Sequence, residues 1–439
     1  MATPRSLGRR EFLLAVLAAA ASAPGRAHAG TITARPRRPA RFVQDRFCIS
    51  ACALAPEDAQ TEERYAQFAA ANFNVVMGGF GARTPTADAR QLELCQKYAL
   101  KAIVYLPGYW ADSGKVTAAE IKQADQFPNH PACWGYNLCD EPNSRLFPYL
   151  GRLVSHLHKV HPGRLGFVNL LPTYADDTQL GERGPHSYDT YVADFMRQVN
   201  PDVLCMDYYP YMQPGHDTRD GYCHNLAILR KHALAAKIPF WNYFNDMVFG
   251  EGHWEHYDPT AAQVRWQIYT SLAYGAKGVI YFCYWTPGWL HSEGVACVAP
   301  DGRLTHHYVE ARRINAKLKN LGPTLMRLTS TAVYRVPRHT NAEVILKGAP
   351  LALDGGPTPG DYLVGIFSHA DGRTAVLLNN YSYAYAAWPT VKFAVRTGRV
   401  VEVAGDTGRE IPLQDDDPEM PGTQVWLAPG EGRLFLFQQ

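Results

Sequence analysis

Eight short runs rich in β-branched and aromatic residues recur at a regular spacing through the chain, and stretches of helical periodicity separate them. A strand, a helix and two loops take roughly 30 to 40 residues, which matches the distance between successive runs. Eight units of this kind predict an α/β fold, a (β/α)8 TIM barrel. An open doubly wound sheet usually has fewer strands and a glycine-rich first turn, and the sequence has no G-x-G-x-x-G. The predicted strands are Phe47–Ala53, Asn74–Gly78, Lys101–Leu106, Cys133–Cys139, Gly166–Leu170, Val203–Tyr208, Pro239–Phe244 and Lys277–Tyr284.

The pattern changes after a predicted helix at Thr305–Leu321. Shorter runs follow in which apolar and polar residues alternate, and turns rich in glycine and proline separate them. We therefore expect the barrel to occupy residues 30–323 and a small C-terminal antiparallel β-sandwich to occupy residues 324–439. Its predicted strands are Thr331–Val336, Tyr362–Phe367, Ala375–Asn379, Val391–Val395, Val400–Val403, Thr423–Leu427 and Arg433–Phe437.

Residues 1–29 have the features of a cleavable export signal. Arg9 and Arg10 precede a short alanine-rich apolar run, and Ala27–Ala29 has the small residues after which a signal peptidase cleaves. The segment Ser6–Leu13 resembles a twin-arginine signal, and a general secretory signal is the alternative. Because the apolar run is too short to span a bilayer comfortably, we expect no stable membrane anchor and a periplasmic or secreted protein.

Positive and negative charges nearly balance, with 43 Lys plus Arg against 41 Asp plus Glu and a net charge of +2. The predicted signal carries four arginines and one glutamate, so the mature chain has a net charge of −1. A protein that binds duplex nucleic acid normally has a clear basic excess, so nucleic acid is a poor candidate partner. The 25 Tyr and 9 Trp favour instead a protein that stacks flat ligand faces such as those of sugars.

The strongest functional signal lies at the end of the fourth predicted strand, where Asp140, Glu141 and Pro142 follow an apolar run. In this fold the reacting groups lie where strands end and the next loops begin. Burying a carboxylate costs several kcal/mol unless it is paired, so two adjacent carboxylates here indicate a chemical use. The alternative is a pair of exposed charges that cap the next helix. A charged Asp140 would disfavour ionisation of Glu141 and keep it protonated near neutral pH, as a general acid requires.

This segment resembles the fourth strand of barrel glycoside hydrolases, in particular those of clan A, in which that strand ends in Asn-Glu-Pro. The resemblance implies that Glu141 is the general acid/base of glycosidic-bond cleavage. Asp140 stands where that clan has asparagine, and a tandem Asp-Glu is similar instead to the barrel hexosaminidases that use substrate assistance. In those enzymes the aspartate orients the 2-acetamido group of the substrate and the glutamate protonates the leaving oxygen, which implies the same roles for Asp140 and Glu141.

Glycosidic cleavage also needs a second carboxylate, about 5 Å from the acid as a nucleophile or about 6.5–9.5 Å away as a base for water. The retaining clan places a glutamate at the end of strand seven, whereas this strand is followed by Asn245 and Asp246. Asp207, at the end of the sixth strand, is flanked by apolar residues, which favours burial and use. Asp207 and Asp246 are therefore the candidate second carboxylates, and Glu251 and Glu255 in the following loop are further acidic residues.

Aromatic and amide side chains gather at the predicted strand ends, as expected for a sugar-binding cavity. The resemblance places Trp285, after the eighth strand, at the floor of a sugar-binding subsite. Histidines such as His253 and His256 match no defined ligand spacing, so we expect no metal and no cofactor. The candidate substrate-binding residues are Tyr109, Tyr209, Asn242, Asn245, Tyr284 and Trp285.

The sequence thus predicts an exported glycoside hydrolase that cleaves an oligo- or polysaccharide with Glu141 as general acid/base. Two alternatives stay open. One is a substrate-assisted hydrolase of the N-acetylhexosaminidase type that uses Asp140 and Glu141. The other is a glycan-binding barrel without catalytic activity, because strand seven lacks the expected glutamate.

Overall fold

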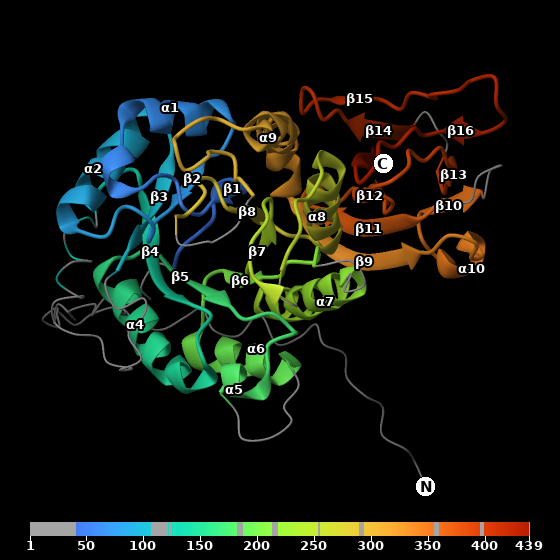
Figure 1. Ribbon diagram of the computed structural model, residues 1–439. Helices are drawn as coiled ribbons and strands as arrows, with labels where there is room; N and C mark the ends of the chain where they lie inside the picture. Colours follow the sequence, from blue (N-terminus) through green and yellow to red (C-terminus); the bar gives the residue numbers. More distant parts are fainter. Residues whose placement is uncertain are drawn as a thin grey trace, which may run out of the picture. The chain divides into compact units, whose positions relative to one another are not determined.

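A computed structural model of the chain shows a closed barrel of eight parallel strands in chain order (Figure 1). Strand β1 pairs with β8 as well as with β2, and this pairing closes the barrel. The predicted TIM barrel is confirmed. The structure describes residues 41–106, 122, 125, 127, 129–181, 188–212, 218–252, 255–288, 294–354, 360–395 and 399–438. The barrel strands are β1 (Cys48–Ala51), β2 (Val75–Met77), β3 (Lys101–Tyr105), β4 (Cys133–Asp140), β5 (Leu165–Leu170), β6 (Leu204–Asp207), β7 (Phe240–Asn245) and β8 (Gly278–Phe282).

Helices connect successive strands, except between β3 and β4, where most of the connection lies outside the described residues, and they cover the outside of the barrel (Figure 1). Their ends follow ordinary capping rules. The side chain of Thr260 accepts a hydrogen bond from the backbone of Gln263 at the start of α8, and the Gln263 side chain accepts one from the backbone of Thr260. The helices are α1 (Glu62–Ala70), α2 (Pro85–Lys97), α4 (Phe147–Val160), α5 (Asp177–Leu180), α6 (Tyr188–Val199), α7 (Arg219–Ala236), α8 (Ala261–Tyr274) and α9 (His306–Leu325).

The barrel strands are buried on both faces, which explains why the sequence shows them as continuous apolar runs. Inside the barrel, the ring of Trp241 stacks on Trp134 with centroids 5.9 Å apart and on Phe167 with centroids 5.7 Å apart. Outside it, Tyr281 on β8 packs edge-on against Phe244 on β7, with centroids 4.5 Å apart. The described interior of the barrel is therefore filled by side chains at this level.

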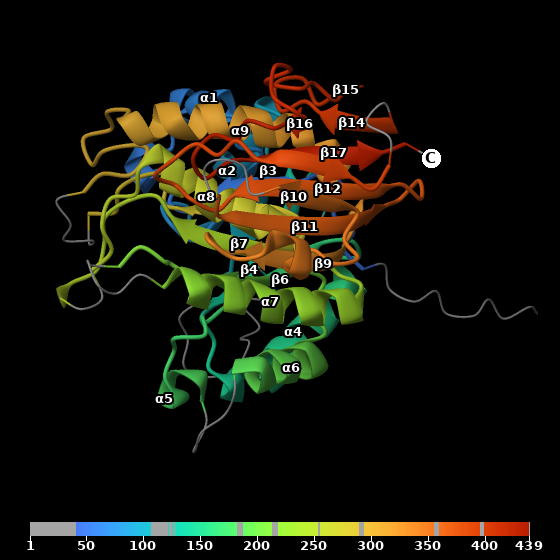
Figure 2. The same cartoon turned by 90° about the vertical axis from the view of Figure 1, so that its right-hand side faces the viewer.

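The C-terminal region has two antiparallel sheets, which confirms the predicted sandwich class. One has the strand order β15-β14-β17-β12-β11-β9 and the other has the order β10-β13-β16. Figure 2 shows β17, β12, β11 and β9 running side by side. Two strands of these sheets, β10 and β15, have no counterpart among the predicted ones, because their sequences, Leu-Ala-Leu-Asp and Glu-Ile-Pro, contain few β-branched or aromatic residues. The elements are β9 (Leu328–Val336), α10 (Ala342–Ile345), β10 (Leu351–Asp354), β11 (Tyr362–His369), β12 (Thr374–Asn380), β13 (Thr390–Phe393), β14 (Val400–Val403), β15 (Glu410–Pro412), β16 (Thr423–Gln424) and β17 (Gly432–Phe437).

Helix α8 of the barrel packs against the six-stranded sheet. The Asn379 side chain on β12 donates a hydrogen bond of 2.6 Å to the backbone oxygen of Tyr269 on α8. Glu431 accepts from Lys317 on α9 and pairs with Arg265 on α8 at 3.8 Å. Within the described part of the chain, no helix has the length and apolar character needed to cross a membrane. The predicted export signal lies outside the described residues.

Candidate active site

An irregularity in β4 places two adjacent carboxylates on one side of the chain. Asn137 lies opposite Phe167 and Cys139 opposite Val168, so β4 contains one extra residue just before its end. Glu141 then has a φ of 45°, in the left-handed region that residues other than glycine rarely adopt. In a regular strand, neighbouring side chains would point to opposite faces. Here the bulge and the turn let Asp140 and Glu141 line the same cavity.

This cavity has a volume of about 480 Å³ and opens at the carboxyl ends of the strands, where barrel enzymes carry their chemistry. It combines three carboxyl groups with one arginine and four aromatic rings. The lining residues are Cys52, Phe80, Arg83, Asp140, Glu141, Asn169, Asp207, Tyr209, Tyr243 and Phe282. A few convergent polar groups among rings are typical of a small-molecule site, and three acids are far more than packing requires.

Asn169 on β5 holds the end of β4 in place. Its side-chain nitrogen donates a hydrogen bond of 3.0 Å to Oδ1 of Asp140, and its backbone oxygen accepts one of 2.8 Å from the backbone nitrogen of Glu141. Across the cavity the carboxyl groups of Glu141 and Asp207 hydrogen-bond to each other. The hydroxyl of Tyr209 donates to Oδ2 of Asp207 at 3.4 Å. All three acids are thus oriented by contacts from neighbouring strands.

Two of the three acids favour their protonated form. Loss of surrounding water and the nearby charge of Asp140 raise the pKa of Glu141 to about 7, although its hydrogen bond with Asp207 acts in the opposite direction. Burial, followed by the charges of Glu141 and Asp140, raises the pKa of Asp207 well above its usual range. A carboxylic acid that still carries its proton near neutral pH can protonate a departing oxygen.

The contact between Glu141 and Asp207 also limits the mechanism. In glycosidases a nucleophile lies about 5 Å from the acid, and a base that activates water lies about 6.5–9.5 Å from it. Here Asp207 interacts with the acid itself, and each of the two carboxyl groups alters the pKa of the other.

The structure places the predicted second carboxylate Asp246 outside this cavity. Asp246 is fully buried, and its Oδ2 accepts a hydrogen bond from the thiol of Cys297 at 3.5 Å. The side chain of Asn242, a predicted substrate-binding residue, turns toward the helices and donates to the hydroxyls of Tyr222 and Ser271 at 2.6 and 3.0 Å. Asn242 and Tyr243 are neighbours on β7, so only one of them can point into the barrel, and that residue is Tyr243.

The remaining predicted substrate-binding residues lie in different parts of the structure. Tyr209 lines the cavity. Tyr284 packs against rings outside the barrel, the nearest being Phe68 at a centroid distance of 4.9 Å. Asn245 is fully buried and is not among the residues that line the cavity. Tyr109 lies outside the described residues.

Trp285 lies in an adjoining hollow of about 380 Å³ that shares Phe80 and Arg83 with the cavity. Its ring lies beneath the guanidinium of Arg64, 5.1 Å from the centroid. This tryptophan therefore does not form the floor of the pocket that holds the acids. It lines a second space that begins at their edge.

Sequence reasoning missed several residues that line the cavity. Asn169 is a polar residue inside the apolar run of β5, and that interruption was a usable signal. Tyr243 lies two residues after Trp241 on β7, and alternate residues of a strand point to the same face. Because Trp241 points into the barrel, this spacing also indicated that Tyr243 does. Arg83 and Phe80 lie in the loop after β2, where no periodicity applies. Arg83 is held through its Nε, which donates to the backbone oxygen of Gly79 at 2.8 Å.

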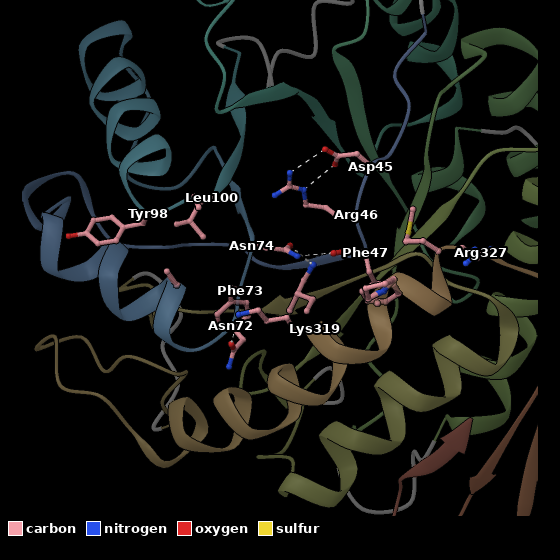
Figure 3. A pocket seen from close by; sticks show the side chains of 16 residues that line it. Asp45, Arg46, Phe47, Asn72, Phe73, Asn74, Tyr98, Leu100, Lys319 and Arg327 are labelled. Atoms are coloured by element: carbon pink, nitrogen blue, oxygen red, sulfur yellow. Dashed lines mark hydrogen bonds and ion pairs between the residues drawn. The ribbon is translucent and has the colours of Figure 1, made fainter. Parts of the chain in front are cut away.

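A cavity of about 660 Å³ lies at the amino ends of β1, β2 and β3 (Figure 3). Its polar groups are engaged with the protein itself. Arg46 pairs with Asp45 at 3.1 Å, and the side chain of Asn74 bonds the backbone of Phe47 and Ile49, both at 2.9 Å (Figure 3). Stabilising the fold is the usual role of this end of a barrel, so we do not place the reaction here.

One described group of side chains has the spacing of metal ligands, namely Asp258, His306 and His307. His307 Nε2 lies 2.8 Å from Oδ1 of Asp258. Burial opposes protonation of His307, but the hydrogen bonds with Asp258 and Glu310 outweigh it and raise the pKa of His307 to about 10. Within this group, His307 and Asp258 therefore form an ion pair.

Comparison with known proteins finds solved structures of similar fold but no matching family. No protein-family model matches the sequence, and no curated protein matches it. A β-galactosidase from Bacillus circulans sp. alkalophilus is similar in structure at a TM-score of 0.60 and 10% identity, over 89% of this chain and 99% of that one. Gan42B, a GH42 β-galactosidase from G. stearothermophilus, is similar at 0.56 and 9% identity, over 90% and 98%. The chain spans 60% of the length of a β-galactosidase from Marinomonas ef1, at 0.47 and 12% identity. The first two likenesses show a shared fold.

Proposed function

We propose that the protein is an exported glycoside hydrolase and that Glu141 is its proton donor. One observation carries the proposal. Glu141, with its pKa raised to about 7, lines a cavity at the catalytic end of the barrel together with Asp140, Asp207 and four aromatic rings. The shared fold with two β-galactosidases along nearly their whole length is consistent with this chemistry.

In the proposed reaction, Glu141 gives its proton to the glycosidic oxygen while the bond between that oxygen and the anomeric carbon breaks. The positive charge that develops on the sugar ring is stabilised by the carboxylate of Asp140, which Asn169 holds at the cavity wall. Tyr209, Tyr243 and Phe282 offer ring faces for the apolar side of the sugar. Water completes the reaction at the anomeric carbon, and Glu141 recovers its proton from it.

Asp207 sets the protonation of Glu141 in this scheme, which gives a test by pH profile. Replacing Asp207 with alanine removes the hydrogen bond that lowers the pKa of Glu141, so that pKa should rise further. Because the acid must be protonated to act, activity falls as the pH rises through this pKa. We expect the alkaline limb of kcat/KM, near pH 7 in the native protein, to move to higher pH in Asp207→Ala.

Asp207→Asn is the matched control, because its amide can still donate a hydrogen bond to Glu141 and should leave the limb near pH 7. The pH dependence of kcat/KM for all three proteins separates the effects. An alkaline limb at the same pH in Asp207→Ala and in the native protein would show that Asp207 does not control the acid.

A second candidate, the substrate-assisted hexosaminidase mechanism, is favoured by the geometry of the acids. β7 contributes no carboxylate to the cavity, and Asp207 is in contact with the acid itself. A 2-acetamido group on the substrate would supply the missing nucleophile. Its oxygen attacks the anomeric carbon as the glycosidic bond breaks, its N–H donates to Asp140, and water then opens the cyclic intermediate.

A comparison of two substrates that differ only at carbon 2 tests this candidate. We expect a 2-acetamido glycoside to be hydrolysed about a hundredfold faster than its 2-hydroxy counterpart, because an attached nucleophile replaces one from solution. Initial rates on matched aryl glycosides measure the ratio. Equal rates would exclude substrate assistance and leave the general proposal of glycoside hydrolysis standing.

A further inference from the structure

Two tryptophans lie directly opposite each other just beyond the ends of β13 and β16, in the C-terminal region. Ala387 pairs with Leu427 in an antiparallel bridge, and Thr390 pairs with Gln424 in β13 and β16. The same register places Trp388 opposite Trp426. The backbone groups of Ala387 and Leu427 exchange both hydrogen bonds, each 2.9 Å long, so the next pair along is not hydrogen-bonded and its side chains come closest together.

Both tryptophan side chains face solvent. Trp388 is 52% exposed and Trp426 is 44% exposed, whereas Val425 and Leu427 on the opposite face of the strand are buried in the domain core. Neither indole stacks on another aromatic ring of the described residues. Large apolar side chains that neighbour each other on a surface generally mark a binding site, while single ones need no explanation.

The backbone that carries Trp426 is fixed by a charged network. The amide nitrogen of Trp426 donates to Oδ2 of Asp416 at 2.7 Å, and the same carboxylate pairs with Arg433. Arg433 also pairs with Glu402, with Nε 2.9 Å from Oε1. The indole therefore projects from a rigid base and not from a free loop.

Trp426 also forms part of the wall of a groove of about 280 Å³. Charged side chains make up much of the remaining lining, namely Lys317, Glu402, Asp406, Glu431 and Arg433. Beside the indoles on their own face, Thr390 and Gln424 hydrogen-bond to each other through their side chains at 2.9 Å. The surface thus combines two flat rings with carboxylates and a guanidinium, and aliphatic side chains such as Leu321, Val403 and Ile411 also line the groove.

We infer that Trp388 and Trp426 form a non-catalytic binding site for a polysaccharide chain. Sugar rings present C–H faces that stack on indoles, and their hydroxyls are bound by carboxylate and guanidinium groups such as those of the groove. The choice of a glycan over another partner rests on the proposed function. The site would hold a polymer on the protein while the barrel cavity cleaves it.

Retention by polysaccharides tests the inference without any turnover. The native chain and its Glu141→Gln variant would be run in native gels that contain laminarin, xylan, galactan or soluble chitosan. We expect at least one polymer to retard both proteins, and the double variant Trp388→Ala/Trp426→Ala to lose at least about tenfold in affinity. The variant Trp388→Tyr/Trp426→Tyr should keep most of the affinity, because it keeps the flat rings. Val344→Ala, which removes an apolar side chain of the same domain that is 69% exposed, is the control and should bind as the native chain does.

The inference is overturned if none of the polymers retards the native chain, or if the double alanine variant is retarded equally. It is also overturned if the two tryptophans prove to mediate association of two copies, seen as a change in sedimentation between the native and the double variant. A chain that is retarded through these tryptophans but hydrolyses no glycoside would contradict the proposed function alone. Activity on a small aryl glycoside should be unchanged in the double variant, which confirms that it is folded.

Discussion

Replacing Glu141 with glutamine should lower kcat/KM for an alkyl glycoside by about three orders of magnitude, because glutamine has no proton to give to the leaving oxygen. The amide has nearly the same shape as the acid, so binding of the sugar should change little. The loss should be smaller for a 4-nitrophenyl glycoside, whose leaving group is stable without protonation. Initial rates on the two substrates, and calorimetric binding of the product sugar, measure both parts of the prediction.

Glu343→Gln is the control, because it makes the same chemical change on the exposed surface of α10 and should have native activity. A loss of equal size for the alkyl and the 4-nitrophenyl glycoside would mean that Glu141 does not protonate the leaving group. Native rates in Glu141→Gln would remove the assignment altogether and favour a barrel that binds glycans without cleaving them.

Replacing Asp246 with asparagine should make the protein more resistant to unfolding at pH 8, by an amount that disappears at acidic pH. Burial raises the pKa of Asp246 from 3.8 to about 7, while the charge of His307 and the Cys297 thiol act in the opposite direction. The folded chain therefore keeps this proton over a pH range in which the unfolded chain has lost it. Over that range stability falls as the pH rises.

The size of this effect follows from the difference between the two pKa values. A shift of about three pKa units corresponds to a loss of about 4 kcal/mol in the free energy of unfolding by pH 7 and above. The amide in Asp246→Asn does not ionise, so the stability difference between the variant and the native protein should grow between pH 4 and pH 8. Urea unfolding at several pH values measures it, with Asp220→Asn, an exposed aspartate on α7, as control. A difference that does not vary with pH would show that Asp246 is not a buried acid of raised pKa.

The barrel could be predicted from sequence because its strands are buried on both faces. Each strand is then a continuous apolar run, and the regular length of the connecting helices sets a spacing that few other folds share. β10 and β15 escaped prediction because Leu351–Asp354 and Glu410–Pro412 contain few of the β-branched and aromatic residues that mark strands.

The acids of the site were visible because Asp140 and Glu141 interrupt an apolar run, and Asp207 does the same on β6. What the sequence did not show is which way each side chain points. On β7 the alternation brings Tyr243 into the cavity and turns Asn242 toward the helices. On β4 a bulge of one residue changes the direction in which the following side chains of the strand point, and no sequence pattern marks this bulge.

Arg83 shows the other limit of sequence reasoning. It comes from the loop after β2 and reaches the site through the path of that loop, held by one hydrogen bond to Gly79. No local pattern marks a residue of this kind, because loops have neither helical nor strand periodicity. Of the two candidate second carboxylates, Asp246 was misplaced for a related reason, since it continues β7 yet is directed to Cys297 and away from the cavity.

The structure of Glu141→Gln with an uncleaved oligosaccharide tests the central proposal most directly. We expect a sugar between Tyr209, Tyr243 and Phe282, with its glycosidic oxygen about 2.6–3.2 Å from the side-chain amide at position 141. An oligosaccharide found only at Trp388 and Trp426, with the barrel cavity holding none, would contradict hydrolysis by these acids.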